Sequence, residues 1–193
     1  MATDLVAERL RDHIEITSEL LRDPSHAKLV AKIADEICEA FRRGNKLILF
    51  GNGGSAADAQ HLAAEMTGRF LKDRPALPAI SLTANTSSLT AIANDYSFDL
   101  VFARQVEALG LVGDVAVGIS TSGNSRNVIC AIEVARKKGL TTVALTGKGG
   151  GNLRSVADYC FTVPSTETPR IQEAHILIGH IICELVENEL TTL

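Results

Sequence analysis

The sequence lacks the marks of several protein classes. No apolar stretch approaches the ~20 residues that a membrane-spanning helix needs. The chain of 193 residues has no run of basic residues and carries a net charge of −4, which argues against nucleic-acid binding. Met1-Ala2-Thr3-Asp4 leads into a charged segment instead of the apolar core of a signal peptide. We therefore expect a cytoplasmic protein with no membrane or nucleic-acid partner.

Cysteine is scarce and dispersed. The four cysteines are far apart, sit in apolar surroundings and form no Cys-x-x-Cys pair. Metal-binding and disulfide frameworks usually show paired or regularly spaced cysteines. We therefore interpret these residues as reduced thiols that act as small hydrophobic side chains. They are Cys38, Cys130, Cys160 and Cys183.

From residue 46 onward, short apolar runs alternate with longer helix-forming segments. This alternation predicts a three-layer α/β/α sandwich around a five-stranded, mostly parallel sheet of the flavodoxin-like kind. Ligands of such folds bind beyond the carboxyl ends of the strands. Strands are expected near residues 46–50, 79–83, 114–119, 141–146 and 158–163, and helices near 55–70, 86–94, 99–109, 125–138 and 168–190.

Residues 1–45 precede this core and are predicted to form two helices. The first carries an apolar stripe and ends near Pro24-Ser25, and the second runs from about His26 to Arg43, where Gly44-Asn45 stops it. We expect residues 1–193 to form a single domain, with the core in 46–193. The first helix serves either as an oligomer contact or as an ordinary packing helix. Its stripe consists of Leu5, Leu10, Ile14, Ile16, Leu20 and Leu21.

A glycine-rich turn joins the first predicted strand to a helix. The strand Lys46–Phe50 is followed by Gly51-Asn52-Gly53-Gly54-Ser55 and then by a helical stretch from Ala56 to Phe70. Free backbone N–H groups and the helix dipole favour an anion at such a junction. The turn lacks the third glycine of the dinucleotide fingerprint, and the chain has no Gly-Lys-Ser/Thr tripeptide. A sugar phosphate is therefore a better candidate ligand than a nucleotide.

The same helix carries a histidine and a carboxylate. His61 and Glu65 are four residues apart, so they share one face of the helix. An acid/base pair beside an anion-binding turn indicates chemistry on a phosphorylated small molecule.

A second turn repeats the pattern. The strand Asp114–Ile119 runs into Ser120-Thr121-Ser122-Gly123-Asn124-Ser125, which holds four hydroxyl groups. Hydroxyls and backbone amides can both donate to phosphate oxygens. The alternative is that these residues cap the next helix, for which serine, threonine and asparagine are preferred. Two such turns on one sheet favour the phosphate interpretation.

The last predicted helix is mostly apolar but contains polar side chains that are costly to bury alone. Helix spacing favours Glu173 as the partner of His180, because seven residues return closer to one azimuth than the eight that separate Gln172 from His180. A lone buried histidine is usually a satisfied core residue. The polar turns elsewhere favour a functional role for His180.

These residues together resemble the sugar isomerase (SIS) domain family and, within it, the phosphoheptose isomerases. The similarity runs along essentially the whole chain. Its motifs are Gly51–His61, Thr67-Gly68-Arg69, Arg74-Pro75, Ala93-Asn94-Asp95, Gly118–Ser125, Leu145–Lys148 and Arg170–His175.

The resemblance implies an isomerase that converts sedoheptulose 7-phosphate into D-glycero-D-manno-heptose 7-phosphate, the first step toward the heptose of lipopolysaccharide core or other activated heptoses. It implies a homotetramer with active sites shared between subunits and one zinc ion per subunit. Carried over to this sequence, the family's catalytic residues are Glu65 and His180. Its metal ligands are His61, Glu65, Gln172 and His180, so the resemblance selects Gln172 where spacing selected Glu173.

The resemblance also assigns substrate contacts. Phosphate contacts are expected from Ser55, Ser120, Thr121, Ser122 and Ser125, and contacts to the sugar from Asn52. A surface salt bridge is an equal alternative for Arg69. The full set of expected substrate-binding residues is Asn52, Gly53, Gly54, Ser55, Glu65, Arg69, Asn94, Asp95, Ser120, Thr121, Ser122, Ser125 and Gln172.

A relative from another class shares the fold and most motifs. The DnaA initiator-associating protein is also similar in Arg170–Glu173 and in Asn124-Ser125-Arg126, but it lacks the glutamate and the last histidine. The presence of Glu65 and His180 together favours the enzyme. A sugar-phosphate-sensing regulator is disfavoured, because such domains usually adjoin a DNA-binding segment. The segment Ser165–Arg170 borders the expected pocket and could shift substrate choice among phosphosugars.

Overall fold

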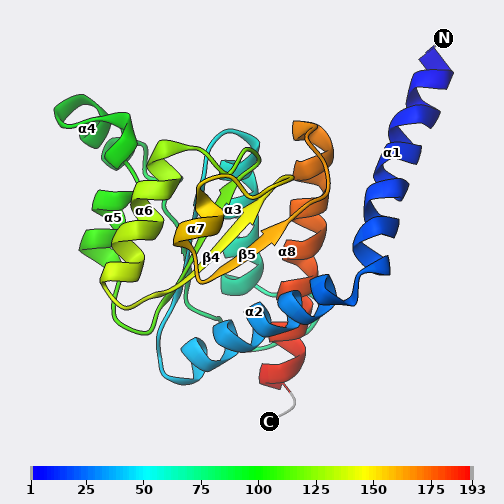
Figure 1. The fold of residues 1–193 in the computed structure, drawn as a ribbon. Helices are drawn as coiled ribbons and strands as arrows, with labels where there is room; N and C mark the ends of the chain where they lie inside the picture. Colours follow the sequence, from blue (N-terminus) through cyan, green and yellow to red (C-terminus); the bar gives the residue numbers. More distant parts are fainter. Residues whose placement is uncertain (1, 192–193) are drawn as a thin grey trace.

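The centre of the structure is a sheet of five strands in the order β2-β1-β3-β4-β5, in which every neighbouring pair is parallel (Figure 1). A computed structural model describes residues 2–191. The α/β sandwich and its flavodoxin-like order are confirmed, and the sheet is wholly rather than mostly parallel. The strands are β1 (Leu47–Gly51), β2 (Ala79–Ser81), β3 (Val115–Ser120), β4 (Thr141–Thr146) and β5 (Tyr159–Thr162).

Helices cover both faces of the sheet, so its central strands are buried on both sides, as parallel strands usually are. Alternate side chains of β1 point to opposite layers: Leu47 and Leu49 join one apolar core, whereas Ile48 and Phe50 join the other. The first core is covered by α2 (Pro24–Arg42), α3 (Gly54–Thr67) and α8 (Thr168–Thr191). The second is covered by α4 (Thr86–Asp95), the 3-10 turn η1 (Phe98–Leu100), α5 (Ala103–Leu109), α6 (Arg126–Lys137) and α7 (Leu153–Val156).

Two predicted helices differ from the observed ones, and one observed helix was not predicted. The helix expected over 55–70 ends at Thr67, where Gly68 donates its N–H to the Ala64 carbonyl and the chain turns away. The helix expected over 99–109 is divided into η1 and α5. The short helix α7 was not predicted, because its four residues are too few to show a helical period.

The N-terminal helices are α1 (Ala2–Arg22) and α2, and they meet at Asp23. The Asp23 carboxylate accepts the Ser25 N–H at 2.9 Å and Pro24 occupies the first helical position, so α2 begins two residues before the predicted start. Helix α1 reaches out from the body of the molecule (Figure 1) and leaves much of its apolar stripe exposed. The exposed members are Leu5, Leu10, Ile14 and Leu21, and the neighbouring Val6 is exposed as well.

All four cysteines are free thiols, and Cys38 and Cys183 are buried. Burial raises the pKa of Cys183 to about 12 and that of Cys38 to about 11, so both stay protonated at neutral pH. Within residues 2–191, no helix combines the length and the apolar character that a membrane crossing requires.

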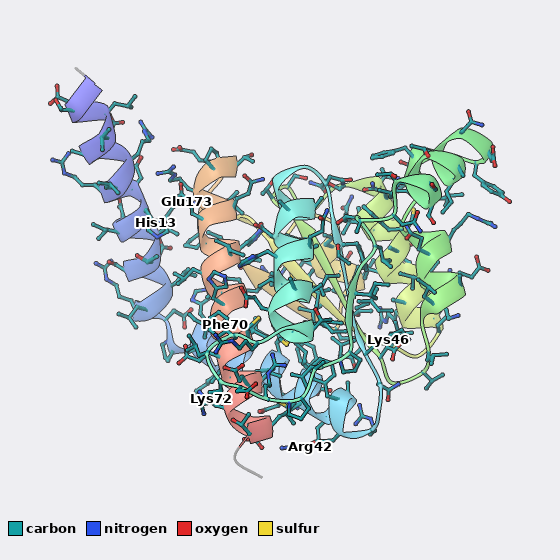
Figure 2. The ribbon with its side chains drawn as sticks, turned by 180° about the vertical axis from the view of Figure 1, so that it is seen from behind. His13, Arg42, Lys46, Phe70, Lys72 and Glu173 are labelled. Carbon is teal, nitrogen blue, oxygen red and sulfur yellow. The ribbon has the colours of Figure 1, made fainter. Side chains whose placement is uncertain are left out.

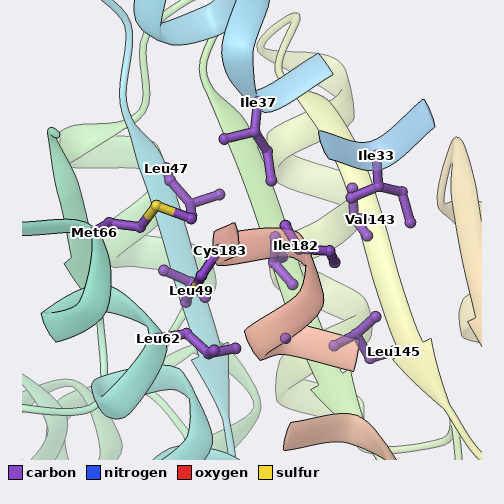
Figure 3. A pocket seen from close by; sticks show the side chains of 12 residues that line it. Ile33, Ile37, Leu47, Leu49, Leu62, Met66, Val143, Leu145, Ile182 and Cys183 are labelled. Atoms are coloured by element: carbon purple, nitrogen blue, oxygen red, sulfur yellow. The ribbon is translucent and has the colours of Figure 1, made fainter. Parts of the chain in front are cut away.

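Helices α3 and α8 approach each other closely at Gly179. A Cβ atom at this position would lie 2.7 Å from both methyl carbons of Leu62. The contact lines an apolar cavity of about 20 Å³ beneath the two helices, among residues that include Met66, Ile182 and Cys183 (Figure 3). The missing side chain at Gly179 therefore sets how near α8 lies to α3.

This contact gives a stability prediction. The substitution Gly179→Ala should lower the free energy of unfolding by about 1–3 kcal/mol, the usual cost of overpacking a well-filled core, as measured by urea denaturation. In a double-mutant cycle with Leu62→Ala, the two costs should sum to more than the cost of the double variant. Simple additivity would show that the Leu62 contact is not the cause.

Candidate active site at the carboxyl ends of the strands

The turn between β1 and α3 presents uncapped backbone amides. Gly53, the residue before α3, has φ +55° and supplies no side-chain cap. Ser55 is buried in the first turn of the helix and its N–H is bonded to the Asn52 carbonyl at 3.0 Å. Because the helix has a glycine in place of a capping side chain, the amino end of α3 is available to an anion.

The turn between β3 and α6 lies beside the first, because β1 and β3 are neighbours. The Ser120 and Ser125 hydroxyls are 2.9 Å apart, and the Ser122 hydroxyl accepts the Asn124 N–H at 3.1 Å. Ser125 precedes α6 but makes no side-chain cap bond. The helix-cap alternative is therefore not realised by the Ser125 hydroxyl, which turns toward Ser120 instead.

A polar hollow of about 200 Å³ opens beside this turn. The loop after β4 joins it, because Gly147 donates its N–H to the Thr121 carbonyl and Lys148 donates its own to the Ser165 carbonyl, both at 2.9 Å. Hydroxyl groups and one cation line the hollow, a lining suited to a phosphate. The lining residues are Thr121, Ser122, Lys148, Ser165, Thr166, Thr168 and Ile171.

The two turns are also linked by a pair of amide side chains. Asn52 and Asn127 exchange two hydrogen bonds of 2.9 Å, each donating to the other's carbonyl oxygen. Asn52 was expected to contact sugar hydroxyls, and this pairing leaves it one N–H and one lone pair for that purpose. Asn127 is buried and sequence reasoning did not identify it.

Two histidines and a glutamate meet between α3 and α8. His61 Nε2 lies 2.9 Å from His180 Nε2 and 3.3 Å from a carboxylate oxygen of Glu65. The His180 ring also packs against Phe70, with ring centroids 5.5 Å apart. The structure thus brings together three residues that the sequence placed on two separate helices.

This group fits a metal ion. One ligand atom from each of His61, Glu65 and His180 can lie within 4.8 Å of the others. With zinc–nitrogen bonds of about 2.0–2.1 Å, two ligands of a tetrahedral site lie about 3.3 Å apart, close to the observed separations. Two imidazoles and a carboxylate are ordinary zinc ligands. The half-exposed His61 side chain leaves the group open on one side.

The fourth expected metal ligand lies elsewhere in this chain. Gln172 sits against Gly54, where an added Cβ atom would clash with its carboxamide group. Gly54 precedes His61 by seven residues, about 10 Å along α3. Gln172 therefore lies nearer the phosphate-binding turn than the histidines, and its role as a metal ligand stays a prediction.

Glu173, which helix spacing favoured, faces α1. Its carboxylate accepts from Arg170 and lies 3.1 Å from His13 Nδ1. Figure 2 shows His13 and Glu173 on these adjoining helices. The spacing argument selected the wrong neighbour, because it used the geometry of α8 alone and could not include α1.

Three expected substrate contacts are exposed side chains. Arg69 is exposed in the loop after α3. Asn94 and Asp95 are exposed at the end of α4, where the Asn94 amide donates to the Asp95 carboxylate at 2.9 Å. Helices α4 and α8 cover opposite faces of the sheet (Figure 1), so Asn94 and Asp95 lie away from His180 within this chain.

Two further ionisable residues border this region. One oxygen of Asp58, one turn before His61, is buried without a hydrogen-bond partner among the described residues, and burial raises the pKa of this carboxyl. The spacing Asp58, His61, Glu65 was a sequence signal that went unused. His175 bonds to the Thr146 carbonyl, and burial lowers its pKa to about 4. His175 is therefore neutral at physiological pH, unsuited to proton transfer there.

Known proteins share the sequence and fold of this chain. Residues 12–147 match the SIS domain. The phosphoheptose isomerase of Geobacter sp. strain M21 is 57% identical over 96% of this chain and 95% of its own, and that of Aneurinibacillus thermoaerophilus is 50% identical over 95% and 93%. The structure of phosphoheptose isomerase GmhA from Neisseria gonorrhoeae, 42% identical, superposes with a TM-score of 0.91 over 97% of this chain and all of its own. The chain therefore belongs to the phosphoheptose isomerase family of SIS-domain proteins.

Proposed function

We propose that the protein is an isomerase that converts sedoheptulose 7-phosphate into D-glycero-D-manno-heptose 7-phosphate. The observation that carries this proposal is the convergence of His61, Glu65 and His180 beside two phosphate-binding turns. The phosphoheptose isomerase names of close relatives support the substrate.

The reaction needs a base and an acid on one side of the substrate. Glu65 takes the proton from C1 of the ketose and returns it to C2, while His180 gives a proton to the C2 oxygen and takes one from the C1 hydroxyl. The product is the aldose, and no atom is gained or lost. A carboxylate suits transfer at carbon, and an imidazole, with its near-neutral pKa, suits transfer between oxygens.

The turns that would bind the phosphate of the substrate lie at a suitable distance from the acid/base residues. Ser55 at the amino end of α3 and His61 are six residues apart, about 9 Å along the helix. An open-chain seven-carbon sugar phosphate can bridge that span. Ser55, Ser120, Thr121, Ser122 and Ser125, with the amides of Gly53 and Gly54, bind the phosphate, and Asn52 contacts the sugar.

Zinc is the metal that this donor set suits best. His61, Glu65 and His180 of one subunit would hold it, and Gln172 would be a fourth ligand if it moved or came from a neighbouring subunit. When bound, the ion supplies a Lewis acid for the substrate oxygens. The same convergence of Glu65 and His180 favours the enzyme over the DnaA-binding alternative.

The enzyme acts in the cytoplasm as a homotetramer with shared active sites. Leu177, Ile181 and Leu185 form a partly exposed stripe on α8, beside an apolar groove of about 410 Å³ between α1, α2 and α8. Apolar surface of this kind on α1 and α8 supports burial against other copies of the chain. Sharing between subunits would also bring Arg69, Asn94 and Asp95 to a neighbour's site.

The first test is turnover of sedoheptulose 7-phosphate by the purified protein. The substitution Glu65→Gln should reduce kcat by about 10²–10⁴-fold, because it removes the base. Removing zinc with a chelator should abolish turnover, and adding zinc back should restore it. Elemental analysis of the restored protein should then find one zinc ion per subunit. Glu133→Gln, an exposed carboxylate on α6, is the matched control and should leave kcat unchanged. A folded oligomer that leaves the substrate unaltered under every metal condition would rule out the assignment.

The phosphate turns give a second prediction. Ser122→Ala should raise KM for sedoheptulose 7-phosphate about tenfold or more with little change in kcat, because a hydrogen bond to a charged group is lost. The control Ser155→Ala removes a serine hydroxyl from α7, outside both turns. A fall in kcat at constant KM would place Ser122 in the chemical step instead.

The tetramer is tested by the mass in solution. The double variant Leu177→Lys/Ile181→Lys should dissociate the tetramer, because it puts charge into an apolar contact, as measured by light scattering after gel filtration. Leu111→Lys/Val112→Lys alters two apolar residues that are more exposed and lie away from α1 and α8, and it should stay tetrameric. If instead Leu111→Lys/Val112→Lys dissociated the tetramer and Leu177→Lys/Ile181→Lys did not, the interface would involve the loop before β3.

A further inference from the structure

A buried carboxylate binds backbone N–H groups of the loop that follows α3. Glu187 on α8 is almost completely buried, and its oxygens accept three successive backbone N–H groups, from Phe70 at 3.0 Å and from Leu71 and Lys72 at 2.8 Å. Burial raises the pKa of this carboxyl, but the three amides and Arg74 outweigh burial and hold the pKa below its ordinary value. Glu187 is therefore charged at neutral pH, and consecutive amides bind such a charge well.

Arg74 completes this clamp from the other side. Its guanidinium is also buried and donates to Glu187 at 3.1 Å. The same side chain donates to the backbone carbonyls of Glu65 and Met66, both at 2.8 Å. Arg74 therefore ties the last turn of α3, which carries Glu65, to the glutamate on α8.

The clamp holds parts of the candidate active site. Phe70, whose N–H bonds to Glu187, packs its ring on His180, and Figure 2 shows it beside α8. Arg69, an expected substrate contact, is the preceding residue in the same loop. Glu187 lies seven residues after His180, two turns along α8 and on the same side.

We propose that Glu187 and Arg74 are positioning residues of the isomerase site: their buried ion pair fixes Phe70 against His180 and fixes the turn of α3 that carries Glu65. The inference rests on the proposed function. Neither residue touches the reacting groups through its side chain. Their effect is on the relative placement of the base and the acid, to which rates are sensitive, since a shift of about 1 Å can cost 10²-fold.

The chain offers a matched control for a merely structural role. Asp114, at the start of β3, is also fully buried and accepts the backbone N–H groups of Lys46 and Leu111 together with the Lys46 ammonium. This second buried carboxylate holds loops at the amino ends of β1 and β3. It lies at the amino ends of these strands, whereas the two glycine- and hydroxyl-rich turns follow their carboxyl ends.

The experiment compares Glu187→Gln with Asp114→Asn in steady-state kinetics on sedoheptulose 7-phosphate, at a temperature where both are folded by circular dichroism. Each variant should lower Tm, because each removes a buried charge from its partners. Glu187→Gln should lower kcat about 10- to 100-fold with KM changed by less than about twofold, since the phosphate turns are untouched. Asp114→Asn should keep the wild-type kcat and KM.

A third variant keeps the test decisive if Glu187→Gln does not fold. Phe70→Leu leaves the clamp intact and removes the ring from His180, so it should lower kcat several-fold at nearly constant KM. Wild-type kcat in whichever of these two variants folds, or equal kinetic losses in Glu187→Gln and Asp114→Asn, would overturn the inference. An inactive wild-type protein would instead refute the proposed function, so the two failures are distinguishable.

Discussion

The parallel pairing of β1 with β3 is the contact on which the proposed phosphate-binding half of the site depends. Gly51 pairs with Ile119 in the sheet register, so the turns that follow the two strands leave the sheet side by side. The approach is tight at Gly51, where a Cβ atom would lie 2.9 Å from the Ile119 carbonyl and 2.8 Å from the Ser55 Cβ. A glycine at the end of β1 therefore lets both turns face one ligand, at the point where the strand order reverses and such folds bind their ligands.

The acid/base half depends on a different contact, between α3 and α8. Both helices start near the carboxyl edge of the sheet and run in the same direction, so residues at similar depth face each other. Gln172 meets Gly54, Gly179 meets Leu62, and His180 meets His61. The absence of a side chain at Gly179 brings the helices close enough for the two imidazoles to lie 2.9 Å apart. The turn before α3 and the histidines thus lie at successive levels along the contact between α3 and α8.

Buried charge fixes two sets of loops in this architecture. Asp114 binds loop amides at the amino ends of the strands, and Glu187 binds loop amides beside the histidines. A carboxylate that accepts several backbone N–H groups stays ionised when buried, and removing it would leave those amides unpaired. The two groups use the same chemistry but hold different loops, so their consequences for activity should differ.

The sequence by itself determined the elements of this protein and the residues at their ends. The period of apolar residues and the glycines after Phe50 and Ile119 are local signals, and they predicted five strands, most of the helices and both phosphate turns. The pairing of His61 with Glu65 also followed from helix geometry within one segment. The resemblance selected Gln172 where local spacing had selected its neighbour Glu173, and it assigned His180 a catalytic role.

Only the tertiary structure decided which helices meet and what each polar residue faces. It placed Glu173 against His13 of α1, set Gln172 beside Gly54 and joined Asn52 to Asn127. It also revealed the Arg74–Glu187 clamp, whose residues are 113 positions apart. These contacts form only when whole layers of helices pack against the sheet. The polar side chains are buried, and so need these partners, only after the layers have come together.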